Sequence, residues 1–549
     1  MKIAIAQLSY HVGNFEGNVL KIKTTIQKAK EAGADLVIFA ELSVSGYPPR
    51  DFLEFDDFID KCQKAVTEIA AKCKGIAAIV GTPTLNPEFE GKDLYNSACF
   101  LYDGMVRHVR HKTLLPNYDV FDEYRYFEPN KKWEVIEYKS QKIALTICED
   151  LWNVGNDPMY TVNPMDKLAE HELDLMINIA ASPFNYNQHQ IRTGVLRENA
   201  KMYHLPLFYV NHVGAQTELL FDGGSMVIDP NGKIVHELNY FEEDFLIVDT
   251  FSLKAGNCER QTDKYPSDQI KTGLIHDALI MGIKTYFHKL GFTKAILGLS
   301  GGIDSAVTLA LAIRALGKEN VISVLLPSQY SSDHSVDDSR ELLKNTGSPH
   351  FTLPIHEAHQ TFKQTLKPIF GNPPSGLTDE NLQARIRGVY LMAMANKYGY
   401  ILLNTSNKSE AAVGYGTLYG DMNGGISVLG DVYKTEVFDL ARYINLEGEI
   451  IPENIITKPP SAELRPNQKD SDSLPDYDIL DKILYQYIEQ RKGPKELITM
   501  GFDEDLVKRT LKLVNTNEYK RYQTPPILRV SPKAFGMGRR MPIVAKYLG

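Results

Sequence analysis

KAILGLSGGIDS, residues 294–305, decides the fold of the second half of the chain. Apolar residues typical of a β-strand lead into SGGIDS, and a helical pattern, AVTLALAIRAL, follows at once. Two adjacent glycines let the backbone turn sharply and bring its N–H groups close to an anion. The start of the next helix adds the positive end of its dipole. The stretch therefore predicts a strand, a phosphate-binding loop and a helix.

The side chains of this loop suit a nucleotide. Ser300 and Ser305 offer hydroxyl donors, and the carboxylate of Asp304 could hold a hard cation. The Gly-Lys-Ser/Thr ending of a Walker A motif is missing, so no loop lysine is expected at the terminal phosphates. SGGIDS in this strand–helix context resembles the PP-loop of the ATP pyrophosphatase family. That resemblance implies cleavage of ATP between its α and β phosphates and adenylation of a substrate.

Length and composition limit the number of domains and the classes of partner. At about 150 residues per domain, 549 residues predict two to four domains. A net charge of −9 argues against nucleic acid as a partner, because no basic field would attract a phosphate backbone. No apolar run approaches the ~18 residues of a membrane helix, and MKIAIAQLSY lacks a signal-peptide core. We expect neither a nucleic-acid nor a membrane partner.

The cysteines indicate a reducing compartment. All of them precede residue 259, and no CxxC pair or zinc-binding spacing occurs among Cys62, Cys73, Cys99, Cys148 and Cys258. We therefore expect a cytoplasmic protein.

Two α/β halves can be traced along the chain. In residues 1–250, short apolar strands such as KIAIAQ, DLVIFAE and KIALTICED alternate with helical or polar stretches, which predicts a layered α/β domain. Residues 251–268 have little periodicity and are interpreted as a linker. Residues 269–549 begin a second series of helices and strands that suits a doubly wound parallel sheet, with its ligand at the strand C-termini.

Three residues of the first half each follow a predicted strand. Glu41 ends DLVIFAE, Cys148 ends KIALTIC, and Lys112 lies in HVRHKTLLPNY. Singly, they could be a helix cap, a buried small hydrophobe and a solvated lysine. Together they offer a thiol, a carboxylate to accept its proton and a cation for the oxyanion, which amide hydrolysis requires.

Glu41, Lys112 and Cys148, within FAELSVSGY, RHKTLLPNY and ICEDLW, resemble the nitrilase superfamily over residues 1–250. The resemblance implies an αββα sandwich that hydrolyses carbon–nitrogen bonds. It implies Cys148 as the nucleophile, Glu41 as the general base and Lys112 as the cation that stabilises the oxyanion. Glu123, in FDEYRYF, matches a second glutamate that orients the lysine.

The same resemblance implies a place for an amino-acid substrate. Tyr118 and Ser182, in LPNYD and NIAASPF, match positions that hold it. With glutamine, the products would be a γ-glutamyl thioester on Cys148 and ammonia, followed by glutamate after hydrolysis.

The second half carries further polar positions beyond the phosphate loop. Asn381, Arg385 and Arg387 lie at the start of the helix predicted by TDENLQARIRGVYLMAMANKY, where guanidinium groups could hold a pyrophosphate or a carboxylate. An exposed helix face is the plainer interpretation of either arginine alone.

The strand YILLNTS then ends near Thr405 and leads to Glu410, at the crevice that a doubly wound sheet uses. GYGTLYGDMNGG and LGDVYKTEV contribute Asp421 and Lys434, and the glycine-rich and proline-rich segments 414–431 and 459–478 are typical of loops.

From about residue 270 onward, these stretches resemble the NAD synthetase family, including KPPSAELRPNQKDSDSLPDYDILD and NEYKRYQTPP. The resemblance implies that Mg²⁺ is held by Asp304 and Glu410, and that Arg385 and Lys434 stabilise the departing pyrophosphate or the adenylate. It implies contacts to deamido-NAD from Asn381, Glu410 and Lys520. It also implies ATP contacts from Gly298, Leu299, Ser300, Gly301, Gly302, Ile303, Asp304, Ser305 and Thr405.

Both resemblances together imply that glutamine supplies ammonia to adenylated deamido-NAD, giving NAD⁺, AMP and pyrophosphate. We also expect a homo-oligomer, and a shielded route for ammonia. Another glutamine-fed ATP-pyrophosphatase amidotransferase with a different acceptor stays open as an alternative, as does a non-catalytic nucleotide-binding protein. Sulfur transfer to tRNA is disfavoured, because no cysteine follows Cys258.

Overall fold

The structure is a computed structural model that describes residues 1–155, 157–253, 265–466 and 468–547. The chain divides into two units, Met1–Ser267 and Asp268–Gly549. Most of the predicted linker 251–268, and Cys258 within it, lies outside the described residues. No helix in the part of the chain that is described is long and apolar enough to cross a membrane.

The described part of the first unit contains two six-stranded sheets. One has the order β14-β1-β2-β3-β4-β5 and the other β13-β12-β9-β8-β7-β6. The first comprises β1 (Lys2–Gln7), β2 (Leu36–Ile38), β3 (Ala77–Leu85), β4 (Leu94–Tyr102), β5 (Met105–His111) and β14 (Asp244–Asp249). The second comprises β6 (Ile136–Tyr138), β7 (Gln141–Ile147), β8 (Leu175–Ile179), β9 (Leu207–Val210), β12 (Met226–Ile228) and β13 (Ile234–Glu237).

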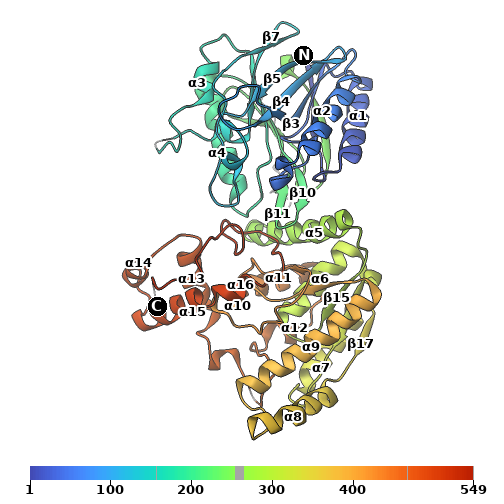
Figure 1. Cartoon of the computed structure of the whole chain (residues 1–549), viewed down its shortest axis with the longest axis vertical. Coiled ribbons are helices and arrows are strands. Elements are labelled where there is room, and N and C mark those ends of the chain that lie inside the picture. Colours follow the sequence, from blue (N-terminus) through green and yellow to red (C-terminus); the bar gives the residue numbers. More distant parts are fainter. Residues whose placement is uncertain (156, 254–264, 467, 548–549) are drawn as a thin grey trace. The chain divides into compact units, whose positions relative to one another are not determined.

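Helices cover the outer face of each sheet, as Figure 1 shows. Alternation along β1 explains the layering: Ala4 and Ala6 pack in a cluster with α1 and α2, whereas Ile3 and Ile5 pack in the core that includes the second sheet. The helices are α1 (Phe15–Glu31), α2 (Asp56–Ala70), α3 (Pro164–Leu168) and α4 (Gln188–Tyr203), and β10 (Val213–Gln216) pairs with β11 (Leu219–Asp222). This arrangement confirms the predicted αββα sandwich.

The second unit is built on a parallel sheet of order β17-β16-β15-β18-β19. The order reverses at β15, so the C-terminal ends of β15, β16 and β18 border the crevice of a doubly wound fold, as predicted. The strands are β15 (Ala295–Gly298), β16 (Val321–Leu325), β17 (His350–Thr352), β18 (Ile401–Asn404) and β19 (Ile426–Ser427).

Helices flank this sheet, and the elements that follow it toward the C-terminus are also helices (Figure 1). α5, α6 and α11 pack together, whereas α9 packs on β15 and β18 with α8 beside it. The sheet-flanking helices are α5 (Ile270–Leu290), α6 (Ile303–Leu316), α7 (Asp333–Thr346), α8 (His356–Phe370), α9 (Leu377–Tyr398) and α11 (Lys434–Ile444). The others are α10 (Lys408–Val413), α12 (Glu453–Thr457), α13 (Tyr477–Ile488), α14 (Pro494–Thr499), α15 (Glu504–Thr516) and α16 (Glu518–Arg521).

Candidate active sites

In the first unit, the predicted catalytic residues lie just past strand ends. Glu41 follows β2, Lys112 follows β5 and Cys148 follows β7. The parallel register of β7 and β8 pairs Ile147 with Ile179, so Cys148 and the segment 180–182 leave the second sheet side by side. The two facing sheets thus bring the carboxylate, the ammonium and the thiol to one place.

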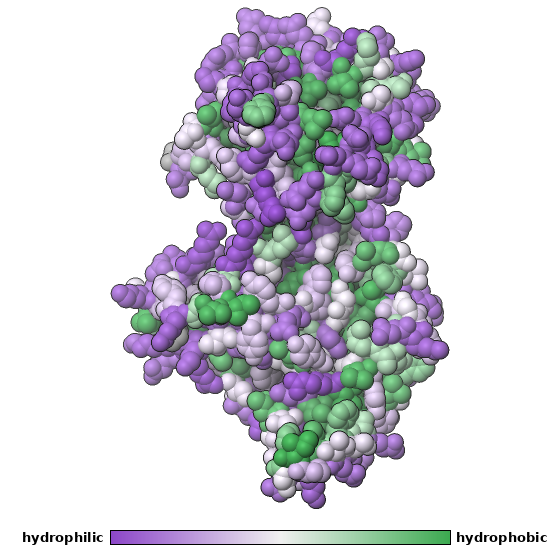
Figure 2. Space-filling view, viewed as in Figure 1, coloured by the Kyte–Doolittle hydropathy of each residue, from purple (hydrophilic) through white to green (hydrophobic). Residues whose placement is uncertain are grey.

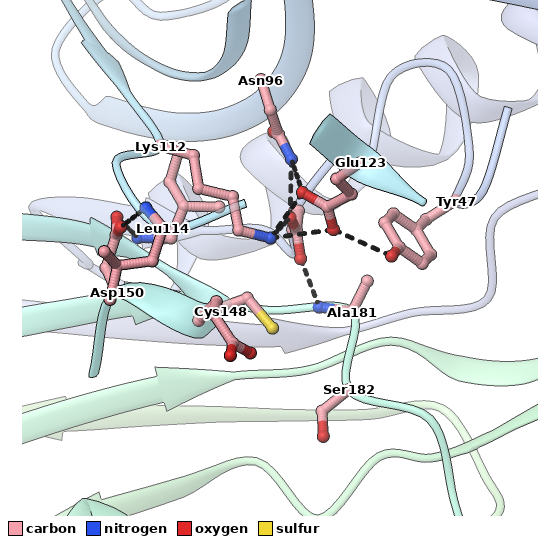
Figure 3. A network of polar contacts seen from close by, with 12 residues as sticks. Tyr47, Asn96, Lys112, Leu114, Glu123, Cys148, Asp150, Ala181 and Ser182 are labelled. Atoms are coloured by element: carbon pink, nitrogen blue, oxygen red, sulfur yellow. Dashed lines mark hydrogen bonds and ion pairs between the residues drawn. The ribbon is translucent and has the colours of Figure 1, made fainter. Parts of the chain in front are cut away.

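Lys112 lies at the centre of this site and is fully buried. Its Nζ donates to Glu41 Oε1 at 2.7 Å and to both carboxylate oxygens of Glu123, at 2.9 and 2.8 Å (Figure 3). Burial disfavours the charge, but Glu123 and Glu41 outweigh it and raise the pKa of Lys112 well above its usual range. Lys112 is therefore a fixed cation.

Glu123 has a different environment from Glu41. Burial raises the pKa of Glu123, and Lys112 opposes that effect. The hydroxyl of Tyr47 also donates to Glu123, at 2.9 Å. Glu41 instead accepts the backbone N–H of Ala181 at Oε2, at 2.9 Å, which links it to the second sheet.

Cys148 begins a short 3₁₀ helix, Cys148–Leu151, and has a left-handed φ of 42°. Burial, and next the charge of Glu41, raise the pKa of its thiol well above the usual range, while Lys112 lowers it. The resting sulfur is thus a thiol, and attack requires a base that takes its proton as the new bond forms. Figure 3 shows the Cys148 side chain beside the Lys112 network.

Asp150 fixes the segments that carry Cys148 and Lys112. Its carboxylate accepts the backbone N–H groups of Thr113 and Leu114, each at 2.9 Å, and of Ile147 at 3.0 Å. Burial raises the pKa of Asp150 to about 7, although these donors oppose the shift.

Glu149 forms a second buried anionic group next to the thiol. The hydroxyls of Tyr118 and Tyr160 donate to its Oε1, at 2.9 and 3.0 Å. Burial raises the pKa of Glu149, while Lys112 and the two tyrosine hydroxyls oppose that effect. Because both phenols are neutral donors, they leave the negative charge available to a substrate ammonium.

Ser182 is buried and held through its backbone. Its N–H donates to Asn211 Oδ1 at 2.9 Å, and Asn211 Nδ2 donates back to the Ser182 carbonyl at 3.2 Å. Ser182 follows Ala181, whose N–H donates to Glu41, and Tyr118 donates to Glu149, the residue after Cys148. The structure therefore brings Ser182 and Tyr118 to the same site as Glu41, Lys112, Glu123 and Cys148.

In the second unit, a cavity of about 320 Å³ opens at the reversal point of the sheet. Thr405, Glu410 and Lys434 line it, together with every residue of the 298–305 loop except Gly301. Gly301 has a φ of 80°, and a Cβ there would lie 2.3 Å from the Ser335 carbonyl oxygen, so only glycine fits.

The start of α6 faces this cavity. Gly302 precedes its first residue, and Ser305 Oγ donates to the Gly302 carbonyl at 2.9 Å. Ser300 Oγ accepts the Gly302 N–H at 3.2 Å, which fixes the turn. The loop and the helix dipole together suit an anion.

Asp304, Glu410 and Lys434 form one cluster among the charged residues that line this cavity. Lys434 Nζ lies 2.5 Å from Asp304 Oδ2 and 3.4 Å from Glu410 Oε1. Asn407 contacts both carboxylates, since its Nδ2 donates to Asp304 Oδ1 at 2.8 Å and its backbone N–H donates to Glu410 Oε2 at 3.3 Å. Burial, and next Asp304, raise the pKa of Glu410 to about 8.

This charge balance fits a divalent cation. One ammonium faces two carboxylates, and a nucleotide would add further negative charge. Mg²⁺ favours a site of one or two carboxylates completed by phosphate oxygens and water. Asp304 and Glu410 are therefore suitable ligands.

Asn381 and Lys520 lie outside the lining of the cavity but contact one neighbouring segment. Thr417 Oγ1 donates to Asn381 Oδ1 at 2.9 Å. Lys520 Nζ donates to the carbonyls of Gly414 and Gly416, at 2.7 and 2.9 Å. The structure brings these two predicted residues together around residues 414–417.

Arg385 does not reach the cavity. Its side chain is exposed, and its Nε donates to the Leu418 carbonyl at 3.1 Å. Arg387, two positions along α9, lines the cavity and donates to the Leu326 carbonyl at 3.0 Å. Burial lowers the pKa of Arg387 to about 10. Side chains two positions apart on a helix point about 200° away from each other, so these two arginines lie on different faces of α9.

Glu149, Tyr160 and Asn96 also belong to the first site, although their sequence patterns did not predict it. Glu149 directly follows Cys148, so its position was the available signal. Asn96 is a polar residue inside the apolar strand LYNSACFLY, and buried polar residues of this kind need partners. Its Nδ2 donates to both glutamates of the site.

Comparisons with known proteins match both halves. The carbon-nitrogen hydrolase family model matches residues 2–253, and the NAD synthase family model matches residues 275–524. A glutamine-dependent NAD(+) synthetase of Synechocystis sp. is 46% identical, over 99% of this chain and 99% of that protein. Another, from Acinetobacter baylyi, is 43% identical, over 99% and 98%.

A solved structure covers the same extent. The glutamine-dependent NAD+ synthetase of Acinetobacter baumannii, in complex with adenosine diphosphate, has a TM-score of 0.76 and 41% identity. The match covers 99% of this chain and 98% of that one.

Proposed function

The chain belongs to the family of glutamine-dependent NAD(+) synthetases, and we propose which of its residues carry out each step of the reaction. Membership confirms the resemblance inferred from the sequence and assigns the activity, ATP-dependent formation of the carbon–nitrogen bond of NAD⁺ with glutamine as nitrogen donor. What carries our assignment of residues is the presence of a buried Glu41–Lys112–Cys148 site in one unit and a phosphate loop in the other.

The acceptor is tested by omission. Purified protein given ATP, Mg²⁺ and ammonium should form AMP only when deamido-NAD is present. AMP formation with another carboxylate, and none with deamido-NAD, would instead favour a different amidotransferase.

In the first unit, we propose that Glu41 takes the Cys148 proton while the sulfur attacks the side-chain amide carbon of glutamine. Lys112 then stabilises the negative oxygen of the tetrahedral intermediate, and Glu123 holds Lys112 in place. The carbon–nitrogen bond breaks, the proton leaves with ammonia, and a γ-glutamyl thioester remains. Water, activated by Glu41, hydrolyses the thioester to glutamate and restores the thiol.

Glu149 is proposed to bind the α-ammonium of glutamine, with Tyr118 and Tyr160 orienting the carboxylate. Ser182, which lies across the site, is proposed to contact the same substrate.

Glu149→Gln should raise the KM for glutamine about 10- to 100-fold, because a charge-assisted bond worth about 1.5–3 kcal/mol is lost. Ammonia release should be measured with glutamine and with glutaramate, which lacks the α-amino group. The natural enzyme should prefer glutamine strongly, and the variant should lose that preference. Glu137→Gln, an exposed position on β6, is the control. A variant that still discriminates between the two amides would refute this role.

In the second unit, we propose that ATP binds along the 298–305 loop and near Thr405, with phosphate oxygens at the start of α6. The nicotinate carboxylate of deamido-NAD attacks the α-phosphorus, and the bond to pyrophosphate breaks. Lys434 offsets the charge on the departing pyrophosphate. Ammonia then attacks the acyl carbon and displaces AMP.

Asp304 and Glu410 are proposed to hold Mg²⁺, which when bound supplies positive charge to the phosphate oxygens. Asn381, Lys520 and Glu410 are proposed to contact deamido-NAD. The resemblance gave Arg385 the role of stabilising the departing pyrophosphate or the adenylate. We propose that Arg387 has this role instead, because Arg387 lines the cavity.

We further propose a cytoplasmic homo-oligomer with small molecules as substrates. Free thiols at Cys62, Cys73, Cys99 and Cys148 suit a reducing compartment, which cell fractionation tests.

Figure 2 shows apolar residues over α8, and exposed side chains there and on α9 include Phe362, Ile369, Phe370 and Leu377. Such a patch favours self-association. Light scattering that gives the 61.8 kDa mass of one chain would refute it.

A further inference from the structure

Asn96 touches both carboxylates that surround Lys112. It lies on β4 and is 1% exposed. Its Nδ2 donates to Glu41 Oε1 at 2.7 Å and to Glu123 Oε2 at 3.3 Å. Its backbone carbonyl accepts the backbone N–H of Lys112 at 2.8 Å, because the β4–β5 pairing continues past Ser97 and His111. Figure 3 shows the Asn96 amide pointing into the network.

The two oxygens of Glu41 are used unequally. Oε1 accepts Lys112 Nζ at 2.7 Å and Asn96 Nδ2 at 2.7 Å, whereas Oε2 accepts the Ala181 N–H at 2.9 Å. Each carboxylate oxygen has about two lone-pair sites. Asn96 and Lys112 therefore fill Oε1, and among the residues that the structure describes Oε2 accepts only the Ala181 N–H, on the side linked to the second sheet.

The cluster around Glu41 has one more negative than positive charge, because one ammonium faces two carboxylates. Lys112 is the cation that both glutamates share, and all three are buried. A neutral amide that donates to both anions stabilises them without adding charge. The titratable groups that face Glu41 or its partners are Tyr47, Lys112, Glu123, Cys148, Glu149 and His212.

We propose that Asn96 is a positioning residue of the glutamine-hydrolysing site, which holds the Glu41 carboxylate through Oε1 and leaves its Oε2 as the atom that receives the Cys148 proton. The inference rests on the proposed function of Glu41 as the base. In the attack, the Sγ–H bond breaks, its proton moves to Oε2, and the sulfur bonds to the amide carbon as the C=O π pair moves to oxygen, forming the oxyanion that faces Lys112. Asn96 touches no substrate atom and acts through Glu41 and Glu123.

The test is the pH profile of glutamine hydrolysis for Asn96→Leu, measured as kcat/KM from glutamate release. Loss of a donor to a buried carboxylate makes ionisation harder, so the acid limb should move to higher pH by about one to two units. At neutral pH, kcat/KM should fall about 10- to 100-fold. Asn96→Asp keeps the shape but adds a third carboxylate, and its acid limb should also move upward.

Thr82→Val, a buried polar position on the neighbouring strand β3, is the matched control and should keep the natural profile. Circular dichroism and the thermal unfolding of each preparation report whether the first unit, which carries both positions, is folded. A folded Asn96→Leu variant with an unchanged acid limb would overturn the role of Asn96. Absence of glutamine hydrolysis in the natural protein would instead overturn the proposed function.

Discussion

Replacing Cys148 by alanine is expected to abolish glutamine-dependent NAD⁺ formation, with a fall of at least about 10⁴-fold, and to preserve ammonium-dependent formation. Without the sulfur, no thioester can form, and Glu41 and Lys112 have no nucleophile to assist. Added ammonium bypasses this step, because the adenylate reacts with ammonia from any source. NAD⁺ should be quantified at saturating glutamine and, separately, at saturating ammonium chloride.

A second buried cysteine provides the control. Cys99 lies on β4, and burial raises the pKa of its thiol to about 12, so it is an inert core residue. Cys99→Ala should retain both activities apart from a small loss of stability. If a folded Cys148→Ala variant lost both activities, or kept the glutamine-dependent one, the assignment of the nucleophile would be wrong.

Asp304→Ala should lose AMP formation with either nitrogen source, by about 10³-fold or more at ordinary Mg²⁺. The change removes a proposed Mg²⁺ ligand and the closest anionic partner of Lys434, 2.5 Å away. AMP released in the presence of deamido-NAD is the quantity to measure.

Asp337→Ala supplies the matched control, because Asp337 is an exposed carboxylate paired with Arg340 on α7. It should keep natural rates. Undiminished AMP formation by Asp304→Ala at ordinary Mg²⁺ would contradict the metal-binding role.

The strand ends were predictable because the chemistry follows the fold. Buried strands give continuous apolar runs, so the end of each run, where a reactive residue such as Glu41 or Cys148 stands, can be located in the sequence. SGGIDS was predictable for a similar reason: its glycines and the following helix have a local signature.

Tertiary contacts placed the residues that the sequence did not single out. Asn96 lies inside an apolar strand, and only its pairing with β5 puts it beside Lys112. Tyr160 reaches Glu149 from a loop that has no strong pattern. Whether Arg385 or Arg387 reaches the cavity depends on which face of α9 packs against the sheet. The apolar residues of α9 are spread almost evenly around the helix, so the sequence does not specify that face.

We propose that glutamine hydrolysis and adenylation serve one amide-forming reaction. One assay with deamido-NAD, ATP, Mg²⁺ and glutamine should measure NAD⁺, AMP and glutamate from the same samples. We predict equal NAD⁺ and AMP, at least as much glutamate, and neither NAD⁺ nor AMP when deamido-NAD is omitted. AMP released without NAD⁺, or NAD⁺ formed without AMP, would contradict the account.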